Sequence, residues 1–374
     1  MGTGSRHGGS RVAFPGGQQC LVVVGNNALV SGNRISNKEG GNFISVTGAL
    51  ASILKNTIIN GDGDVVVNGN QATISGNLIS TIEDNGAIRI VGDDAVVTSN
   101  RSYNLDDDAI NIAGHRALVS KNTVMNIYGN AIEITGNDAL ATANKVTGDE
   151  DDAIYITGNR ATILKNRITY VAGTGIYVVG NNYRIEGNTI LDVADDEDGI
   201  YVSQSTLDAA AGGVIAKNKL AYIVENGLDL SVHGATIEKN TVLWSGSEGE
   251  QSIYISGNDN LVLNCTVKDN EHHGFEIRGN NNILRGCKAL GSHKDGFRIV
   301  AGSVGTLLDN CQAIDCGGQG LHNEDDAPGA TNTSAISCTF KDNHLDIADG
   351  GSGIIDLTDT TFDTGGIGTP AEVN

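Results

Sequence analysis

The chain has 374 residues, a formal net charge of -21, 51 glycines and only 3 prolines. This acidic balance argues against nucleic acid or an anionic membrane as the main partner. No run of apolar residues approaches the roughly 18 needed for a membrane-spanning helix, so the sequence predicts no membrane span.

A repeat of about 22 residues runs through the chain, and each copy begins with a short apolar-x-apolar strand. The first apolar residue of that strand recurs at Leu21, Ile44, Val65, Ile88, Ile110, Ile132, Ile154, Ile176, Ile200, Leu228, Ile253, Phe275, Phe297 and Leu321. A fixed period in the low twenties, short strands and no helical stripe predict an all-β fold, a parallel β-solenoid of about 14 coils. The scarcity of proline agrees, because proline in a central strand would delete a ladder hydrogen bond.

The repeat predicts one β-helix domain over residues 21–345. A polar, Gly-rich lead at 1–20 precedes it, and a tail or cap at 346–374 follows. The first residues lack an apolar signal-peptide core, and we expect a mature extracellular or periplasmic protein. A solenoid end exposes strand edges, which a cap or a homo-oligomeric contact through that end would cover.

Two columns of small polar residues are predicted inside the solenoid. An asparagine opens the third strand of most coils and is expected to form a hydrogen-bonded ladder. Its members are Asn33, Asn56, Asn77, Asn100, Asn122, Asn144, Asn166, Asn188, Asn218, Asn240 and Asn264. Cys265, Cys287, Cys311 and Cys338 recur about one coil apart, which favours a buried stack of free thiols over disulfides.

An outward row of side chains on the first strand predicts a ligand groove. Residues alternate inward and outward along a strand, so the residue after each apolar anchor faces solvent. The row includes Tyr155, Tyr177, Tyr201 and Tyr254, and Asp229 lies between the last two of these. The row continues through Glu276, Arg298 and His322, and Arg278 lies beside the row on the strand of Glu276. Sugars stack on exposed aromatic faces and charged groups bind carboxylates, so this row is interpreted as a glycan groove. Tyrosine also simply suits an exposed strand, which is the alternative. Enlarged loops at 203–213, 244–251 and after Leu321 occur on the same coils, and such loops tend to border ligand grooves.

Acidic turns precede these strands. Asp151 and Asp152 form one such turn, and Asp195, Asp196 and Asp198 form another. Carboxylates on neighbouring turns repel one another unless a hard cation bridges them, so these turns are candidate Ca²⁺ ligands. A solvated acidic ridge is the other interpretation.

The repeat segments GNNALVSGNRI, GFEIRGNNNILRGCKAL and DGFRIVAG resemble the parallel β-helix repeats of the pectate-lyase-like superfamily. This resemblance implies a right-handed, single-stranded β-helix and a secreted lyase, hydrolase or C5-epimerase of acidic polysaccharides, often calcium-dependent. The segment beginning at His272 is similar in texture to coils of mannuronan C5-epimerases, but it lacks their Asp-Pro-His-Asp signature.

Three functions are weighed from these residues. A lyase or C5-epimerase acting on a uronate needs a cation for the substrate carboxylate and a base for the C5 proton. Lys294, Arg298, His273, Glu276 and His322 on adjacent coils are the candidates, and this is the favoured function.

An inverting glycoside hydrolase of polygalacturonase type is the first alternative. Asp229 and Glu276, two coils apart at about 9.6 Å, would be its carboxylates. A non-catalytic glycan-binding or adhesin-type solenoid is the second alternative.

Overall fold

The fold is a β-solenoid throughout the described chain. The computed structural model describes residues 6–8, 11–13, 21–38, 40–83, 86–204, 212–247, 249–324, 326–349, 353–362 and 367–368. All regular elements among them are β-strands, and three parallel sheets form a right-handed solenoid of about 15 turns of about 22 residues. The predicted fold class is therefore confirmed. The chain folds into two compact units, Met1–Val179 (unit 1) and Gly180–Asn374 (unit 2).

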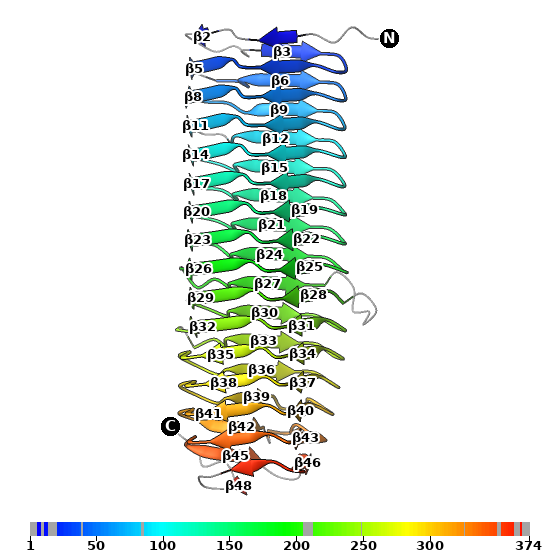
Figure 1. The fold of residues 1–374 in the computed structure, drawn as a ribbon, viewed down its shortest axis with the longest axis vertical. Coiled ribbons are helices and arrows are strands. Elements are labelled where there is room, and N and C mark those ends of the chain that lie inside the picture. The colour runs from blue at the N-terminus through cyan, green and yellow to red at the C-terminus, as the bar shows by residue number, and fades with distance from the viewer. Residues whose placement is uncertain are drawn as a thin grey trace. The chain divides into compact units, whose positions relative to one another are not determined.

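In unit 1, each turn contributes one strand to each of three sheets, called A, B and C (Figure 1). Sheet A contains β1 (Arg6–Gly8), β4 (Leu29–Ser31), β7 (Ser52–Leu54), β10 (Thr73–Ser75), β13 (Val96–Thr98), β16 (Leu118–Ser120), β19 (Leu140–Thr142) and β22 (Thr162–Leu164). Sheet B contains β2 (Arg11–Ala13), β5 (Arg34–Lys38), β8 (Thr57–Gly61), β11 (Leu78–Ile82), β14 (Arg101–Leu105), β17 (Thr123–Ile127), β20 (Lys145–Asp149) and β23 (Arg167–Val171). Sheet C contains β3 (Leu21–Val24), β6 (Ile44–Thr47), β9 (Val65–Asn68), β12 (Ile88–Val91), β15 (Ile110–Ala113), β18 (Ile132–Thr135), β21 (Ile154–Thr157) and β24 (Ile176–Val179).

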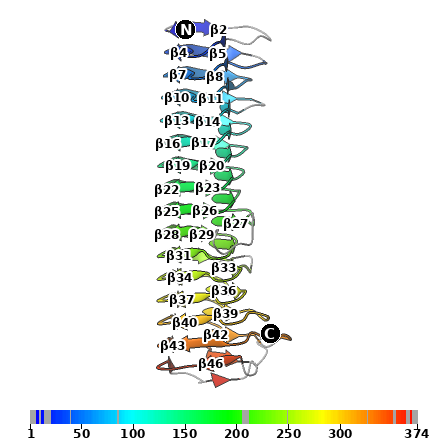
Figure 2. The same cartoon turned by 90° about the vertical axis from the view of Figure 1, so that its right-hand side faces the viewer.

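Unit 2 repeats this arrangement, and Figure 2 shows the strands of sheets A and B from the side. Sheet A contains β25 (Arg184–Glu186), β28 (Val214–Ala216), β31 (Thr236–Glu238), β34 (Leu261–Leu263), β37 (Ile283–Arg285), β40 (Leu307–Asp309), β43 (Thr333–Ile336) and β46 (Ile354–Asp356). Sheet B contains β26 (Thr189–Val193), β29 (Lys219–Ile223), β32 (Thr241–Ser245), β35 (Thr266–Lys268), β38 (Lys288–Leu290), β41 (Gln312–Ile314), β44 (Thr339–Lys341) and β47 (Thr361–Phe362). Sheet C contains β27 (Ile200–Ser203), β30 (Leu228–Ser231), β33 (Ile253–Ser256), β36 (Phe275–Arg278), β39 (Phe297–Ile299), β42 (Gln319–Asn323), β45 (Leu345–Asp349) and β48 (Ile367–Gly368).

The predicted domain boundaries at residues 20 and 345 stay predictions. Strands β1 and β2 lie before Leu21 and pair in parallel with β4 and β5. Strand β45 continues the pairing of sheet C from β42.

The core is a set of apolar columns, one residue per turn. In sheet C, Ile132 pairs with Ile154 and Ile154 with Ile176, and all three side chains are fully buried. In unit 2 two adjacent members of the same column are aromatic, and the rings of Phe275 and Phe297 stack with centroids 4.9 Å apart. Each buried side chain of this size stabilises the fold by roughly 1.5–3 kcal/mol relative to exposure, so the repeat itself supplies the core.

The predicted asparagine ladder is confirmed in both units. Asn144, for example, accepts the amide N–H of Asn122 at 2.9 Å and donates from Nδ2 to the carbonyl of Val119 and to Oδ1 of Asn166, each at 3.0 Å. The ladder therefore bonds backbone groups at a corner where the strands separate.

One member of the predicted ladder is wrong. Cys265, not Asn264, occupies the ladder position after Asn240, whose Nδ2 lies 3.8 Å from the Cys265 Sγ. Cys287, Cys311 and Cys338 continue the column as buried free thiols, so the predicted thiol stack is confirmed. Among the described residues, no helix is long and apolar enough to cross a membrane.

Candidate functional site

The outward row of sheet C in unit 2 brings the predicted site residues into register. Tyr201 pairs with Asp229, and Asp229 pairs with Tyr254. The row continues through Glu276, Arg298 and His322, each paired with the one before it. Adjacent strands lie about 4.8 Å apart, so residues more than a hundred positions apart in sequence form one continuous surface.

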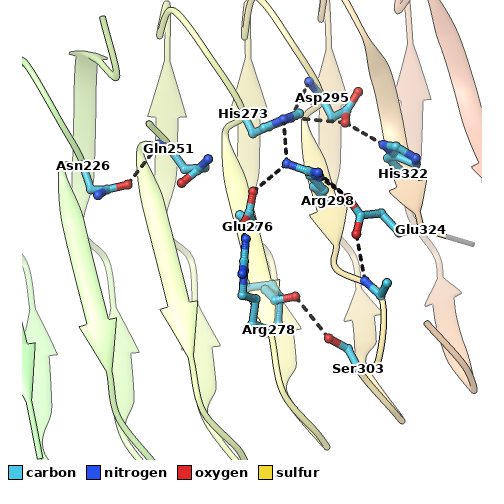
Figure 3. A network of polar contacts seen from close by, with 12 residues as sticks. Asn226, Gln251, His273, Glu276, Arg278, Asp295, Arg298, Ser303, His322 and Glu324 are labelled. Carbon is cyan, nitrogen blue, oxygen red and sulfur yellow. Dashed lines mark hydrogen bonds and ion pairs between the residues drawn. The ribbon is translucent and has the colours of Figure 1, made fainter. Parts of the chain in front are cut away.

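Arg298 is the centre of a buried polar network, shown in Figure 3. Its Nη1 donates to Oε2 of Glu276 at 3.0 Å, and its Nε donates to Oε1 of Glu324 at 2.6 Å. Oε1 of Glu276 is bound by Arg278, whose Nη2 lies 3.0 Å away. Glu276 is only 1% exposed and Arg298 is 27% exposed. The guanidinium of Arg298 is therefore occupied by two carboxylates of the protein itself.

Glu324 completes this network from the end of β42. Its Oε2 accepts the amide N–H of Ala301 at 2.8 Å, while Oε1 faces Arg298. Burial alone would raise the pKa of Glu324, but the Ala301 amide and the Arg298 charge together lower it. Glu324 is therefore a fixed carboxylate.

Asp295 binds two histidines at once. Its Oδ2 lies 2.9 Å from Nδ1 of His322 and 3.1 Å from Nδ1 of His273, and its Oδ1 accepts the amide N–H of Gln319 at 2.7 Å. Burial would raise the pKa of Asp295, but hydrogen bonds from the two imidazoles lower it far below its usual range. Burial alone would lower the pKa of His322, and the hydrogen bond to Asp295 raises it overall. Asp295 is thus ionised, and it favours the imidazolium form of His322.

The His273 ring lies between Arg298 and Asp295. Nε2 lies 3.3 Å from Nη1 of Arg298. Nδ1 accepts the amide N–H of Asp295 at 3.1 Å and lies 3.1 Å from Oδ2 of the same residue. His272 packs edge-on against this ring at 4.3 Å, and burial followed by the His273 charge lowers the pKa of His272 to about 4. The His273 ring thus connects Arg298 with the turn that contains Asp295.

Arg278 lies at the open side of the network. Its guanidinium carbon lies 5.5 Å from the centre of the Tyr254 ring, and its side chain is 51% exposed. Although Glu276 binds the Arg278 guanidinium, about half of the Arg278 side chain is exposed to solvent. Arg278 and the Tyr254 ring therefore form one surface that combines a cation with an apolar face.

Asp229 is the least satisfied carboxyl on the row. Its Oδ1 is buried and has no hydrogen-bond partner among the described residues. Burial, and then the charge of Glu250, raises the pKa of Asp229 to about 6. A carboxyl in this state holds a proton at mildly acidic pH, so Asp229 can donate one to a ligand between Tyr201 and Tyr254.

A column of turn residues precedes sheet C, and it explains several of the acidic side chains. Oδ1 of Asp198 accepts the amide N–H of Asn226 at 3.1 Å, and Oδ1 of Asn226 accepts the amide N–H of Gln251 at 3.0 Å. In unit 1, Oδ1 of Asp152 accepts the amide N–H of Thr174 at 2.8 Å. Each side chain binds the turn backbone of the next coil, so these residues have a structural role.

The residues predicted to bind calcium lie in both units. In unit 1, Asp151 is exposed and its Oδ1 accepts the Asp152 amide at 3.0 Å. In unit 2, Asp195 and Asp196 are exposed, whereas Asp198 is buried; burial and then the Asp229 charge raise the Asp198 pKa to about 8. Among the described residues, no group of three or more His, Cys, Asp or Glu side chains has a geometry that could hold a metal ion. Calcium binding stays a prediction.

The tyrosines of unit 1 form their own pair. Tyr155 and Tyr177 are in register, and their rings stack with centroids 5.0 Å apart. They continue the outward row of sheet C in unit 1, as predicted from the alternation along the strand.

A cavity of about 290 Å³ lies on the same row of unit 1, lined by Asp64, Arg89, Asn111 and the turn before them. Asn111 Nδ2 donates to Oδ2 of Asp108 at 2.8 Å and to Oε2 of Glu133 at 2.7 Å. Burial and the hydrogen bond with Asp108 raise the pKa of Glu133 to about 7. Glu133 is thus a carboxyl of unit 1 that holds a proton near neutral pH.

The predicted site is brought together only in part. Lys294 is exposed, and among the described residues its ammonium group makes no hydrogen bond or ion pair, whereas its neighbour Asp295 binds two histidines. Asp295, Glu324 and Glu250 were missed by the sequence analysis. Asp295 aligns with His273 in the turn column, and that alignment is the signal that could have identified it.

Known proteins share the architecture of this chain. The family model described as "Right handed beta helix region" matches residues 108–242 and 207–364. No curated protein matches the sequence. Among solved structures, tailspike protein 3 of bacteriophage CBA120 is 11% identical, with a TM-score of 0.44 over 91% of this chain and 57% of that chain.

Two further structures are similar at the same level. The receptor-binding protein of bacteriophage Det7, a tailspike, is 13% identical with a TM-score of 0.43, over 93% of this chain and 76% of that chain. A PL6 alginate lyase solved with a trisaccharide is 12% identical with a TM-score of 0.40, over 92% of this chain and 86% of that chain. The chain spans only 57% and 54% of the first two matched structures. At these TM-scores, the likenesses do not bear on the activity.

Proposed function

Because this chain belongs to the right-handed β-helix family, we propose that unit 2 uses the outward row of its sheet C to bind and hydrolyse a uronate-containing glycan, with Asp229 as the general acid. One observation carries the proposal. Asp229 has a buried carboxyl oxygen with no partner among the described residues, in register between Tyr201 and Tyr254. A carboxyl with a buried oxygen that lacks a partner, placed between two partly exposed tyrosines, can keep the proton that acid catalysis needs.

Hydrolysis would need a proton donor and a second carboxylate. In the proposed step, Asp229 gives its proton to the glycosidic oxygen, the bond from the anomeric carbon to that oxygen breaks, and its electron pair stays on the oxygen. Water attacks the anomeric carbon and loses a proton to the carboxylate of Glu250. Glu250 is chosen because its charge, after burial, raises the pKa of Asp229. Glu276, the partner expected from the sequence, is 1% exposed and bound by two arginines.

The substrate class follows from the charges beside Asp229. Tyr254 offers an apolar face to a sugar ring, and the half-exposed Arg278 next to it can bind a carboxylate. His322, whose pKa is raised by Asp295, adds a second partly exposed cation on the same side. These groups favour a sugar acid over a neutral sugar at the subsite beyond Tyr254.

Elimination or epimerisation of a uronate is the second candidate, and Arg278 favours it because this chemistry also needs a cation at the substrate carboxylate. The bases expected from the sequence support it less. Arg298 is bound by two carboxylates, and Lys294 is exposed outside the network.

A panel of polygalacturonate, alginate and a neutral glucan tests the proposal. Hydrolysis yields new reducing ends without unsaturated product, whereas elimination yields unsaturated ends that absorb in the ultraviolet. We expect Asp229→Asn to abolish turnover and Lys294→Ala, its control on an exposed residue, to retain it. Binding of a glycan without any change in it would show a binding protein instead.

The pH profile separates the two reactions. An acid with a pKa of about 6 is protonated below that pH, so hydrolysis through Asp229 is expected to decline above about pH 6. A rate that rises through this range would mean that Asp229 acts as a base and would favour elimination.

Calcium dependence and an extracellular or periplasmic location accompany this proposal. If Asp195 and Asp196 hold Ca²⁺, removal of the ion by EGTA is expected to weaken glycan binding. The control variants Asp195→Asn and Asp196→Asn should then bind the glycan equally well with and without EGTA. Unchanged binding after chelation would count against the calcium site.

A further inference from the structure

In each coil from β5 to β44, one residue near the end of the sheet B strand adopts the left-handed conformation. It is the penultimate residue of the five-residue strands and the residue directly after the three-residue strands. In unit 2 the residues at this position are Asp192, Tyr222, Trp244, Asp269, Gly291, Asp315 and Asp342, with φ between 48° and 65°. In unit 1 they are Asn37, Asn60, Thr81, Asn104, Asn126, Gly148 and Tyr170. Glycine, asparagine and aspartate tolerate this conformation, whereas bulky aromatic residues adopt it only at an energetic cost.

Tyr222 and Trp244 depart from that preference on two adjacent coils. Their rings stack with centroids 4.9 Å apart and planes within 8° of parallel. Even so, Tyr222 is 53% exposed and Trp244 is 45% exposed. Two large aromatic side chains are thus held on the surface in a strained backbone conformation. Tyr170 of unit 1 shares this conformation, but its neighbour in the column there is Gly148, so the stack of two rings distinguishes Tyr222 and Trp244.

The neighbouring coils place no aromatic residue next to this stack in the column. The next residues in the column are Asp192 on the Tyr222 side and Asp269 on the Trp244 side. Each ring covers one face of the other, and a short aspartate cannot cover the face that remains. Sugar rings bind aromatic faces through their C–H groups, and a flanking carboxylate can accept a hydroxyl hydrogen bond.

The stack is close in sequence to the proposed catalytic centre. Tyr222 precedes Asp229 by 7 residues, and Trp244 precedes Glu250 by 6. Hydrogen bonds join the segments that follow the two aromatic residues, from the Gly246 amide to the Glu225 carbonyl at 3.0 Å and from the Ser247 hydroxyl to the Val224 carbonyl at 3.3 Å. These bonds link the two coils next to the aromatic stack.

We propose that Tyr222 and Trp244 form an aromatic platform that binds pyranose rings of the glycan away from the cleaved bond. The inference rests on the proposed function and extends it, because it assigns the substrate as a polymer. The bound chain crosses from sheet C over the turns of two adjacent coils to sheet B, instead of following sheet C alone. Under this proposal, a trisaccharide bound at Asp229 makes no contact with the platform.

Glycan binding to Trp244→Asn and Tyr222→Asn tests the platform, with both variants built on the inactive Asp229→Asn chain. Asparagine suits the left-handed backbone, so both variants are expected to keep or slightly raise the thermal midpoint. We expect about tenfold weaker binding of sodium polygalacturonate or sodium alginate, whichever the parent binds, and no change for its trisaccharide. Tyr170→Asn, at the same column position in unit 1, is the matched control and should bind normally.

Fluorescence gives an independent measurement, because the sequence has 1 tryptophan and that residue is Trp244. Polymer binding should change its emission, whereas trisaccharide binding should not. The platform would be overturned if both variants kept the affinity of the parent and if polymer binding left the Trp244 emission of the parent unchanged. The proposed hydrolysis would still stand. A parent chain that neither binds nor cleaves any glycan in the panel would overturn both.

Discussion

Replacing Arg298 by methionine should destabilise unit 2, whatever it does to turnover. Methionine keeps much of the aliphatic length but removes the charge that two carboxylates share. Glu276, 1% exposed, would retain only Arg278, and Glu324 would retain only the Ala301 amide. Breaking a buried ion pair from one side costs about 3–5 kcal/mol. Because Arg298 is 27% exposed and Arg278 remains, we expect about 3 kcal/mol, at the lower end of that range.

Urea unfolding followed by the emission of Trp244 measures this change inside unit 2. Lys294→Met is the matched control, since Lys294 is exposed and lies on the same coil, and its effect should stay within about 0.5 kcal/mol. Adding Glu276→Gln to Arg298→Met should recover part of the loss, because a neutral amide needs no counter-charge. Equal unfolding midpoints for Arg298→Met and Lys294→Met would refute the reasoning and return Arg298 to the catalytic role expected from the sequence.

Two further predictions concern unit 1. Asn144→Ala removes four hydrogen bonds of the buried ladder and should lower the unfolding free energy by about 3 kcal/mol. Asn68→Ala, at an exposed position in β9, should cost under about 0.5 kcal/mol. Circular dichroism in urea measures both variants, and equal costs would contradict the role of the ladder. Burial raises the pKa of Asp149 from 3.8 to about 9, so its contribution to stability is full below pH 3.8 and is lost as the pH rises through about 9. Asp149→Asn should therefore flatten the fall in thermal midpoint between pH 5 and pH 9, and an unchanged slope would show that Asp149 is solvated.

Part of the candidate site could be predicted because residues one repeat apart in the sequence of a solenoid lie next to each other on adjacent coils. Asp229, Glu276, Arg298 and His322 were expected on one row, and the observed strand pairing confirms that register. The same reasoning placed Asn264 in the asparagine ladder, but the next residue, Cys265, occupies that position. The residue type in the ladder changes from asparagine to cysteine at this coil, so the sequence offers no repeated residue by which to align it.

Partners and protonation states could not be predicted in this way. Lys294 and Asp295 are adjacent in sequence, yet one is exposed and the other binds two histidines. Which of two neighbouring residues turns inward depends on the path of the turn, and the spacing of the repeat does not specify that path.

The sequence by itself determined the all-β solenoid, its period and the residues that share each column, because a regular hydrophobic repeat leaves only one register that buries every anchor. The tertiary structure alone decided which charges neutralise one another, which carboxyls keep a proton and where Tyr222 and Trp244 are held in a left-handed backbone. Those properties depend on burial, on distances of a few ångströms and on backbone angles, and different side chains can occupy the same column with different values of each.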